Sequence, residues 1–220
     1  MTPIYQAEET TIVNAPIKIL LVDDHTLLRS GVKLLLQRNP QFQVVGEASN
    51  GLDGVRLAAE LRPDVVLMDL NLPEMNGLEA IAQIRRADPA ARIAILTTFR
   101  GEEDVYRGLQ AGASGYLLKD SGFEQLAVCI RDVAAGRKYL QPEVASCLAG
   151  RMHHERLSVR EMDILRHLAT GKCNKGIARS AGIEAGTVKH HVKNILAKLQ
   201  VSSRTEAAII ASQRGLLSQY

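Results

Sequence analysis

Five side chains that could bind a cation and a phosphoryl group each follow a short apolar run in the sequence. In chain order they are Asp23 and Asp24 after residues 17–22, Asp69 after residues 65–68, Thr97 after residues 93–96, and Lys119 after residues 115–118. Continuous apolar runs of this length are typical of parallel strands that are buried on both faces. Ligands bind just beyond the carboxyl ends of such strands, so we expect these groups to meet at one edge of a sheet. Carboxylates there could hold a hard divalent cation, and the ammonium could offset phosphoryl charge.

Strand-like and helix-like patterns alternate over residues 17–138. Strands are expected at 17–22, 42–48, 65–69, 92–97 and 115–118, with amphipathic helices at 26–38, 51–61, 78–87, 102–111 and 123–135. The spacing Ser121-x-x-Glu124 is that of a capping box and predicts the start of the last of these helices. Five strands alternating with five helices predict a doubly wound α/β domain with a five-stranded parallel sheet.

The last third of the chain shows helical patterns only. Capping-box spacings at 158–161 and 203–206 predict two helix starts, and further helices are expected over 174–181 and 187–199. Within the last of these, apolar residues recur every three or four positions, which leaves Lys189, His190 and Lys193 pointing outward together. The last third of the chain is therefore expected to be a small all-α domain that presents these three side chains on one face of its basic helix.

The patterns divide the chain into four parts, and charge follows the division. We expect a mobile extension at 1–16, the α/β domain at 17–138, a linker with one short helix at 139–155 and the helical domain at 156–220. Residues 1–150 carry 15 Lys and Arg against 19 Asp and Glu, whereas residues 151–220 carry 12 against 5. A basic C-terminal part indicates nucleic acid as its partner, although a solvated basic surface would give the same composition.

The remaining composition excludes several classes of protein. Three cysteines without a C-x-x-C spacing predict neither a disulfide framework nor a metal site, and we interpret them as buried thiols. No apolar stretch approaches the roughly 18 residues of a membrane helix, and the polar N-terminus is unlike a signal peptide. We therefore expect a cytoplasmic protein without membrane contact.

The α/β part resembles the receiver domain of a two-component response regulator. The acidic pair, Asp69, Thr97 and Lys119 stand in the order of that family's site, and residues 156–220 resemble a LuxR-type helix-turn-helix. The whole chain thus resembles a response regulator of the NarL/FixJ class. The resemblance implies a DNA-binding transcription regulator that is switched when a partner sensor histidine kinase phosphorylates Asp69.

The receiver resemblance also implies a role for each group at the edge of the sheet. Asp69 is the phospho-acceptor, and Lys119 pairs with a phosphoryl oxygen. Mg²⁺ is bound by Asp23, Asp24, Asp69 and the backbone carbonyl of Asn71, with Asp23 acting mostly through a bound water. Thr97 and Tyr116 form a switch, in which Tyr116 turns inward when Thr97 moves. Taken singly, each residue has an ordinary structural interpretation, such as a helix cap, a surface charge or a core aromatic ring. Their placement at successive strand ends favours the phosphoryl site.

The LuxR-type resemblance implies base and phosphate contacts at Lys189, His190 and Lys193. Weaker candidates for phosphate contacts are Lys175, Arg179 and Arg204. The resemblance also implies a homodimer on double-stranded promoter DNA, bound to paired half-sites about one helical turn apart. Gly176 stands where Glu is usual in this family, and it should weaken the short helix.

Three other functions share parts of this pattern. A magnesium-dependent phosphatase with an aspartyl intermediate needs an acid/base Asp two residues after its nucleophile, where this chain has Asn71. A constitutive DNA-binding protein with a silent receiver would not need Asp69, Thr97 and Lys119 intact. A LuxR regulator that binds a signal molecule would need an apolar cavity domain without an acidic rim. The sequence favours a phosphorylation-switched regulator over a turnover enzyme.

Overall fold

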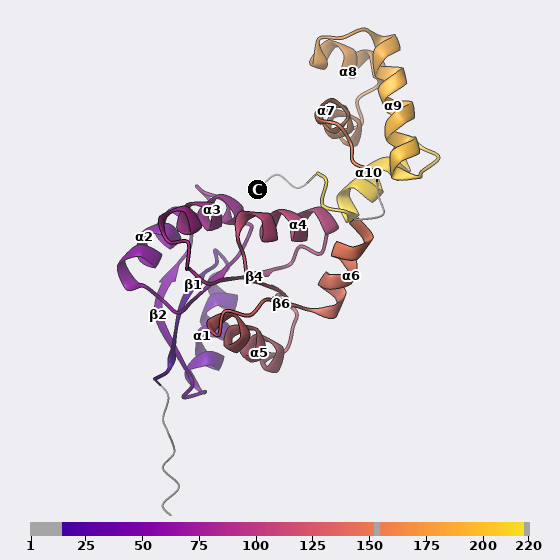
Figure 1. The fold of residues 1–220 in the computed structure, drawn as a ribbon. Helices are drawn as coiled ribbons and strands as arrows, with labels where there is room; N and C mark the ends of the chain where they lie inside the picture. The colour runs from indigo at the N-terminus through magenta and orange to yellow at the C-terminus, as the bar shows by residue number, and fades with distance from the viewer. Residues whose placement is uncertain (1–14, 152–154, 218–220) are drawn as a thin grey trace, which may run out of the picture.

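Six parallel strands form one sheet in the N-terminal part of the protein (Figure 1). This computed structural model describes residues 15–151 and 155–217, so the extension expected at 1–16 lies almost wholly outside the described residues. The strands are β1 (Ile17–Val22), β2 (Phe42–Ala48), β3 (Val65–Met68), β4 (Ile93–Thr97), β5 (Gly115–Leu118) and β6 (Tyr139–Leu140). Their order, β2-β1-β3-β4-β5-β6, confirms the doubly wound α/β class but corrects the expected number of strands to six. A strand of two residues is too short to show a period of two in the sequence.

Helices cover both faces of this sheet. They are α1 (Thr26–Gln37), α2 (Gly51–Leu61), α3 (Gly77–Ala87), α4 (Glu102–Ala111) and α5 (Phe123–Ala134). Alternate strand residues point to opposite faces, so Val22 belongs to the core formed with residues of α2, α3 and α4, whereas Leu21 belongs to the core formed with residues of α1 and α5. The capping box predicted at Ser121 is wrong, because α5 begins after Gly122 and has no side-chain cap.

Within the stretch expected to be a linker, residues 139–155, the described residues 139–151 continue the α/β unit. Strand β6 pairs with β5, with Tyr116 opposite Leu140. The helix α6 (Pro142–Arg151) then packs against α4, and Val144 is only 2% exposed in the core that α2, α3 and α4 share. The core of the α/β unit thus continues past residue 138 into α6.

Four helices surround a separate core in the C-terminal part. They are α7 (Val159–Ala169), α8 (Asn174–Ala181), α9 (Ala185–Leu199) and α10 (Arg204–Gln213). The capping box at the start of α7 is confirmed, because the Ser158 hydroxyl accepts the Glu161 N–H and the Glu161 carboxylate accepts the Ser158 N–H. Burial would raise the pKa of Glu161, but hydrogen bonds from Lys198, at 2.8 Å, and from Ser158 outweigh burial and lower that pKa.

Two expectations drawn from composition can be compared with the described residues. Cys129 is buried as expected, but Cys173 is exposed, because it stands at the start of α8 on the surface of the helical unit. No helix among residues 15–151 and 155–217 is long and apolar enough to span a lipid bilayer.

The helical unit contacts the α/β unit where the end of α10 meets the start of α4, a contact we term the α4–α10 junction. The Glu103 N–H donates to the Arg214 carbonyl at 3.0 Å, and the Arg214 Nε lies 3.6 Å from the Glu102 carboxylate. Gly215 adopts a φ of +73°, and a Cβ atom there would overlap the buried Asp104 carboxylate. Figure 1 shows α10 beside α4 and α6, and α9 running along one edge of the helical unit, from beside α10 away from the α/β unit. The α/β unit therefore leaves the outward face of α9 uncovered.

Candidate functional site

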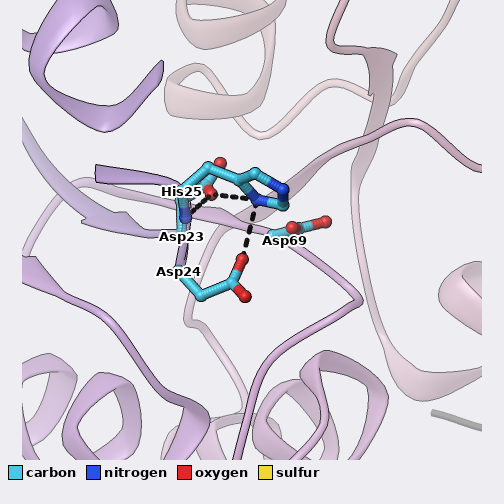
Figure 2. A group of neighbouring side chains, drawn as sticks. All are labelled: Asp23, Asp24, His25 and Asp69. Atoms are coloured by element: carbon cyan, nitrogen blue, oxygen red, sulfur yellow. Dashed lines mark hydrogen bonds and ion pairs between the residues drawn. The ribbon is translucent and has the colours of Figure 1, made fainter. Parts of the chain in front are cut away.

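Four side chains from the ends of β1 and β3 converge on one point (Figure 2). Asp23, Asp24 and His25 follow β1, Asp69 follows β3, and each offers a ligand atom within 4.8 Å of the others. The parallel register explains this convergence, because the Asp69 N–H donates to the Val22 carbonyl at 2.9 Å and joins the two strand ends. The structure therefore brings together the three carboxylates that the sequence predicted at one edge of the sheet.

Lys119, directly after β5, reaches into the same cluster. Its Nζ lies 2.7 Å from an Asp69 oxygen and 2.8 Å from an Asp23 oxygen, and its side chain is 8% exposed. Burial would lower the pKa of Lys119, but hydrogen bonds and charge attraction from Asp23 and Asp69 outweigh burial and raise that pKa. Lys119 is therefore an ammonium that offsets the charge of two buried carboxylates.

Asp69 is nearly fully buried, with a side chain that is 3% exposed. One carboxylate oxygen accepts the Leu70 N–H at 2.7 Å, and the other accepts a hydrogen bond from Lys119. A close turn holds this segment, because the Gly77 N–H donates to the Leu70 carbonyl at 3.0 Å and a Cβ atom at Gly77 would overlap the Asp69 carbonyl. A carboxylate held by donors on both oxygens has a fixed orientation, as a nucleophile in phosphoryl transfer requires.

The donor set fits a hard divalent cation such as Mg²⁺. Asp23, Asp24 and Asp69 supply oxygen ligands, and the Asp24 side chain is 33% exposed, which leaves room for the waters that Mg²⁺ retains. The Oδ1 atom of Asp24 is buried and accepts no hydrogen bond from the described residues, although His25 Nδ1 lies 2.7 Å away. A cation would satisfy such an oxygen. Asn71 lies in the exposed loop two residues after Asp69.

Thr97 and Tyr116 meet the backbone of the loop between β4 and α4. Both side chains are fully buried. The Thr97 Oγ1 lies 3.5 Å from the Phe99 backbone nitrogen, and the Tyr116 hydroxyl donates to the Phe99 carbonyl at 3.0 Å. The ring that the receiver resemblance expects to turn inward is thus inside the protein in this structure.

His25 belongs to the acidic cluster, although the sequence pattern gave it no role. Its Nδ1 lies 2.7 Å from an Asp24 oxygen and 3.3 Å from an Asp23 oxygen, and the Lys119 Nζ is 3.5 Å away. The ring is 59% exposed and stands before the first turn of α1. Its position directly after an acidic pair at a strand end is the signal that could have identified it.

The three residues predicted to read DNA lie together on an exposed face of α9. Lys189, His190 and Lys193 are exposed, whereas Val188 and Ile195 are fully buried in the core of the helical unit. This alternation of exposed and buried positions is the one that the apolar periodicity predicted. The face combines two ammonium groups with an imidazole, which are groups that contact phosphates and base edges.

The weaker candidates for DNA contact differ in their surroundings. Lys175 and Arg179 are exposed on α8, which forms despite Gly176. Arg204 is partly buried, and its guanidinium donates to the Lys172 carbonyl. The Arg204 side chain therefore holds the loop before α8, a structural role that the sequence did not suggest.

Two family models match the chain. Residues 19–131 match the response regulator receiver domain, and residues 155–211 match the LuxR family of bacterial regulatory proteins. The transcriptional regulatory protein LiaR of Bacillus subtilis (strain 168) is 43% identical over 210 residues, which cover 92% of this chain and 100% of LiaR. The nitrate/nitrite response regulator protein NarL of Escherichia coli (strain K12) is 44% identical over 207 residues, which cover 90% of this chain and 96% of NarL.

Solved structures share the fold. The response regulator ChrA of a heme-sensing two-component system is 35% identical, with a TM-score of 0.57 over 92% of this chain and 100% of ChrA. The response regulator RcsB of Salmonella typhimurium is 24% identical, with a TM-score of 0.70 over 89% of this chain and 99% of RcsB. The α/β unit and the helical unit thus occur together, in this order, in other proteins.

Proposed function

Because this chain belongs to the response regulators that join a receiver domain to a LuxR-type DNA-binding domain, we propose that phosphorylation of Asp69 controls its binding to DNA. Members of this family are DNA-binding transcription regulators, and a receiver domain implies a histidine kinase as its partner. The observation that carries the proposal is the meeting of Asp69, Lys119 and the acidic pair at one edge of the sheet.

In the proposed reaction, a carboxylate oxygen of Asp69 attacks the phosphorus of a phosphohistidine on the kinase. The new O–P bond forms as the N–P bond breaks, so the histidine leaves with the electron pair of that bond and Asp69 becomes an aspartyl phosphate. Lys119, whose Nζ is 2.7 Å from Asp69, would offset the charge on the phosphoryl oxygens. Phosphoryl transfer needs mainly this positioning and charge neutralisation.

We further propose that Asp23, Asp24 and Asp69, with the backbone carbonyl of Asn71, hold Mg²⁺. When bound, the ion would supply positive charge against the oxygens of the transferring group. The contacts of the acidic pair support this assignment. Asp23 is oriented by Lys119 and by the His25 backbone N–H at 2.8 Å. The buried Oδ1 of Asp24 lies 2.7 Å from His25 Nδ1 and accepts no hydrogen bond from the described residues.

Thr97 and Tyr116 would convey the change from the phosphoryl group to the helical unit. The Thr97 hydroxyl would donate to a phosphoryl oxygen, and its movement would act on the loop at Phe99, which both side chains contact. That loop leads into α4, whose first turn forms the α4–α10 junction. Phosphorylation would thereby shift the populations of two arrangements of the two units.

The helical unit would bind promoter DNA through the exposed face of α9. We assign base and phosphate contacts to Lys189, His190 and Lys193, and phosphate contacts to Lys175, Arg179 and Arg204. LuxR-type recognition helices lie in the major groove, and a homodimer would then meet half-sites about one helical turn apart. RcsB, a more distant relative, has been solved as two dimers bound to two parallel DNAs.

Phosphoryl uptake tests the proposal directly. Purified protein with Mg²⁺ and acetyl phosphate should gain one base-labile phosphoryl group, measured by intact mass, and should lose it slowly to water without turning over small phosphoesters. Asp69→Asn should gain none, whereas Asp64→Asn, a matched change at the opposite end of β3, should behave as wild type. Equal labelling of Asp69→Asn would rule out Asp69 as the acceptor. Identical DNA affinity with and without the phosphoryl group would instead indicate a constitutive DNA-binding protein.

A further inference from the structure

We propose that Gln141 is a positioning residue for Lys119, a role that rests on the proposed phosphoryl chemistry at Asp69. Gln141 lies between β6 and α6, outside the residues that match the receiver family, and its side chain is almost completely buried. Buried amides need partners for one acceptor and two donors. The three partners of Gln141 all belong to the segment that presents Lys119 or to the helix that follows it.

The side-chain oxygen of Gln141 adds one hydrogen bond to the edge of the sheet, beyond the end of β6. Strand β6 ends after Leu140, because Pro142 begins α6 and has no N–H to donate. On the side of β5 that faces β6, the next backbone donor is the Leu118 N–H, and the Gln141 Oε1 accepts its hydrogen bond at 3.0 Å. A side chain therefore replaces the strand at the residue immediately before Lys119.

The donors of Gln141 hold the other end of the same segment. Its Nε2 donates to the Ser121 hydroxyl oxygen at 2.8 Å and to the side-chain Oε1 of Gln125 at 3.3 Å. The orientation of the Gln141 amide is fixed, because only its oxygen can face the Leu118 N–H. Ser121, which does not cap α5, is instead the partner of this amide.

Lys119 is thus held from both sides of its strand. On the β4 side, the Lys119 N–H donates to the Thr97 carbonyl at 2.9 Å, and on the other side Gln141 holds the residues before and after Lys119. These hydrogen bonds matter because the Lys119 Nζ contacts Asp69 and Asp23 at hydrogen-bond distance, and a shift of the Lys119 backbone would move the Nζ away from both carboxylates. A residue beyond the family match therefore contributes to the geometry of the phosphoryl site.

The experiment compares phosphoryl uptake from acetyl phosphate, with Mg²⁺, in the full chain and in Gln141 variants. Gln141→Met keeps the length of the side chain but removes the amide, and we expect its initial rate to fall about tenfold or more. Gln141→Glu keeps an oxygen for the Leu118 N–H and should restore at least half of the wild-type rate. The matched control is Gln125→Ala, which removes only the outermost hydrogen bond and should stay within twofold of wild type.

A double-mutant cycle with Lys119→Ala distinguishes positioning from general stabilisation. If Gln141 acts through Lys119, then Gln141→Met should change the slow rate of Lys119→Ala by less than twofold. A wild-type rate in Gln141→Met, or the same tenfold loss in both backgrounds, would overturn the role of Gln141 while leaving the chemistry at Asp69 in place. Absence of phosphoryl uptake by the wild-type chain would overturn the proposed function, and the role of Gln141 with it. If Gln141→Met does not fold, Gln141→Glu still tests the proposal. A folded Gln141→Glu variant that takes up phosphate as slowly as Lys119→Ala would contradict the positioning role of Gln141.

Discussion

Replacing Lys119 by Met should destabilise the α/β unit when no divalent cation is present. The variant loses the ion pairs from Lys119 to Asp69, at 2.7 Å, and to Asp23, at 2.8 Å. The two remaining carboxylate side chains are only 3% and 9% exposed. Removing one partner of a buried ion pair costs about 3 to 5 kcal/mol, because the remaining charge is uncompensated. Each carboxylate here keeps one backbone N–H donor, from Leu70 or from His25, so we place the loss at the lower end, about 3 kcal/mol.

Mg²⁺ should return most of that stability to the variant. Ligand binding to the folded state adds about 2.7 kcal/mol at a ligand concentration of 100 times Kd. In the wild type the ion has to share Asp69 and Asp23 with the Lys119 ammonium, whereas in Lys119→Met it meets the two carboxylates without that ammonium. The increase in unfolding free energy on adding Mg²⁺ should therefore be larger in Lys119→Met than in wild type.

Hydrogen exchange of β1 and β3 peptides along a urea series, with EDTA or with Mg²⁺, measures this stability for the α/β unit alone. Lys138→Met is the matched control, because Lys138 is exposed, and it should stay within about 0.5 kcal/mol of wild type. The electrostatic reasoning fails if Lys119→Met loses no more stability than Lys138→Met in EDTA, or if Mg²⁺ stabilises Lys119→Met and wild type equally.

Three further predictions concern the helical unit. Lys189→Ala and Lys193→Ala should each weaken DNA binding and lower the slope of log K against log salt by about 0.9, measured by fluorescence anisotropy, because each removes one phosphate contact. The folded state lowers the pKa of Glu161, so the unfolded state binds a proton at a higher pH than the folded state does. The unfolding free energy of the helical unit, measured by urea titration, should therefore fall as the pH drops below 4.5, the ordinary pKa of this carboxyl, and Glu161→Gln should flatten that dependence. Gly215→Ala should open the α4–α10 junction and speed amide exchange at Glu103, because the new methyl group would overlap the Asp104 carboxylate.

The DNA-binding and the junction predictions each have a control in the same chain. Lys138→Ala removes an equal charge on the α/β unit and should leave the salt slope unchanged. A slope that stays at the wild-type value in both α9 variants would mean that another helix binds the phosphates. Gly136 has a φ of +77°, and apart from its own neighbours in the chain no described atom lies within 4 Å of where a Cβ would be, so Gly136→Ala introduces similar backbone strain without a clash. If it speeds exchange at Glu103 as much as Gly215→Ala does, the junction does not depend on Gly215.

The meeting of the acidic cluster with Lys119 could be predicted because each residue follows a local pattern. Asp69, Thr97 and Lys119 all stand where an apolar run stops at a polar group. Parallel strands bring such ends to one edge of a sheet, so no knowledge of contacts was needed. The exposed face of α9 was predictable for the same reason, since a period of 3.6 residues separates buried from exposed positions.

Interactions between distant segments leave no such pattern. Ser121-x-x-Glu124 has the spacing of a capping box, but the Ser121 hydroxyl is bonded to Gln141, which is 20 residues away in the chain. Tyr139 and Leu140 form a strand only because the edge of β5 is available to pair with them. The α4–α10 junction depends on backbone atoms of Glu103 and Arg214, which no side-chain pattern marks.

The α4–α10 junction determines how much free energy opposes separation of the α/β unit from the helical unit. The first N–H groups of a helix and its last carbonyls lack partners within that helix, and here Glu103 and Arg214 satisfy one another across two domains. When they part, water replaces both partners, so the hydrogen bond opposes separation by only about 1 kcal/mol. Under the proposed switch, this contact would favour one arrangement of the two units before phosphorylation, and a few kilocalories per mole would be sufficient to make the other arrangement the more populated one.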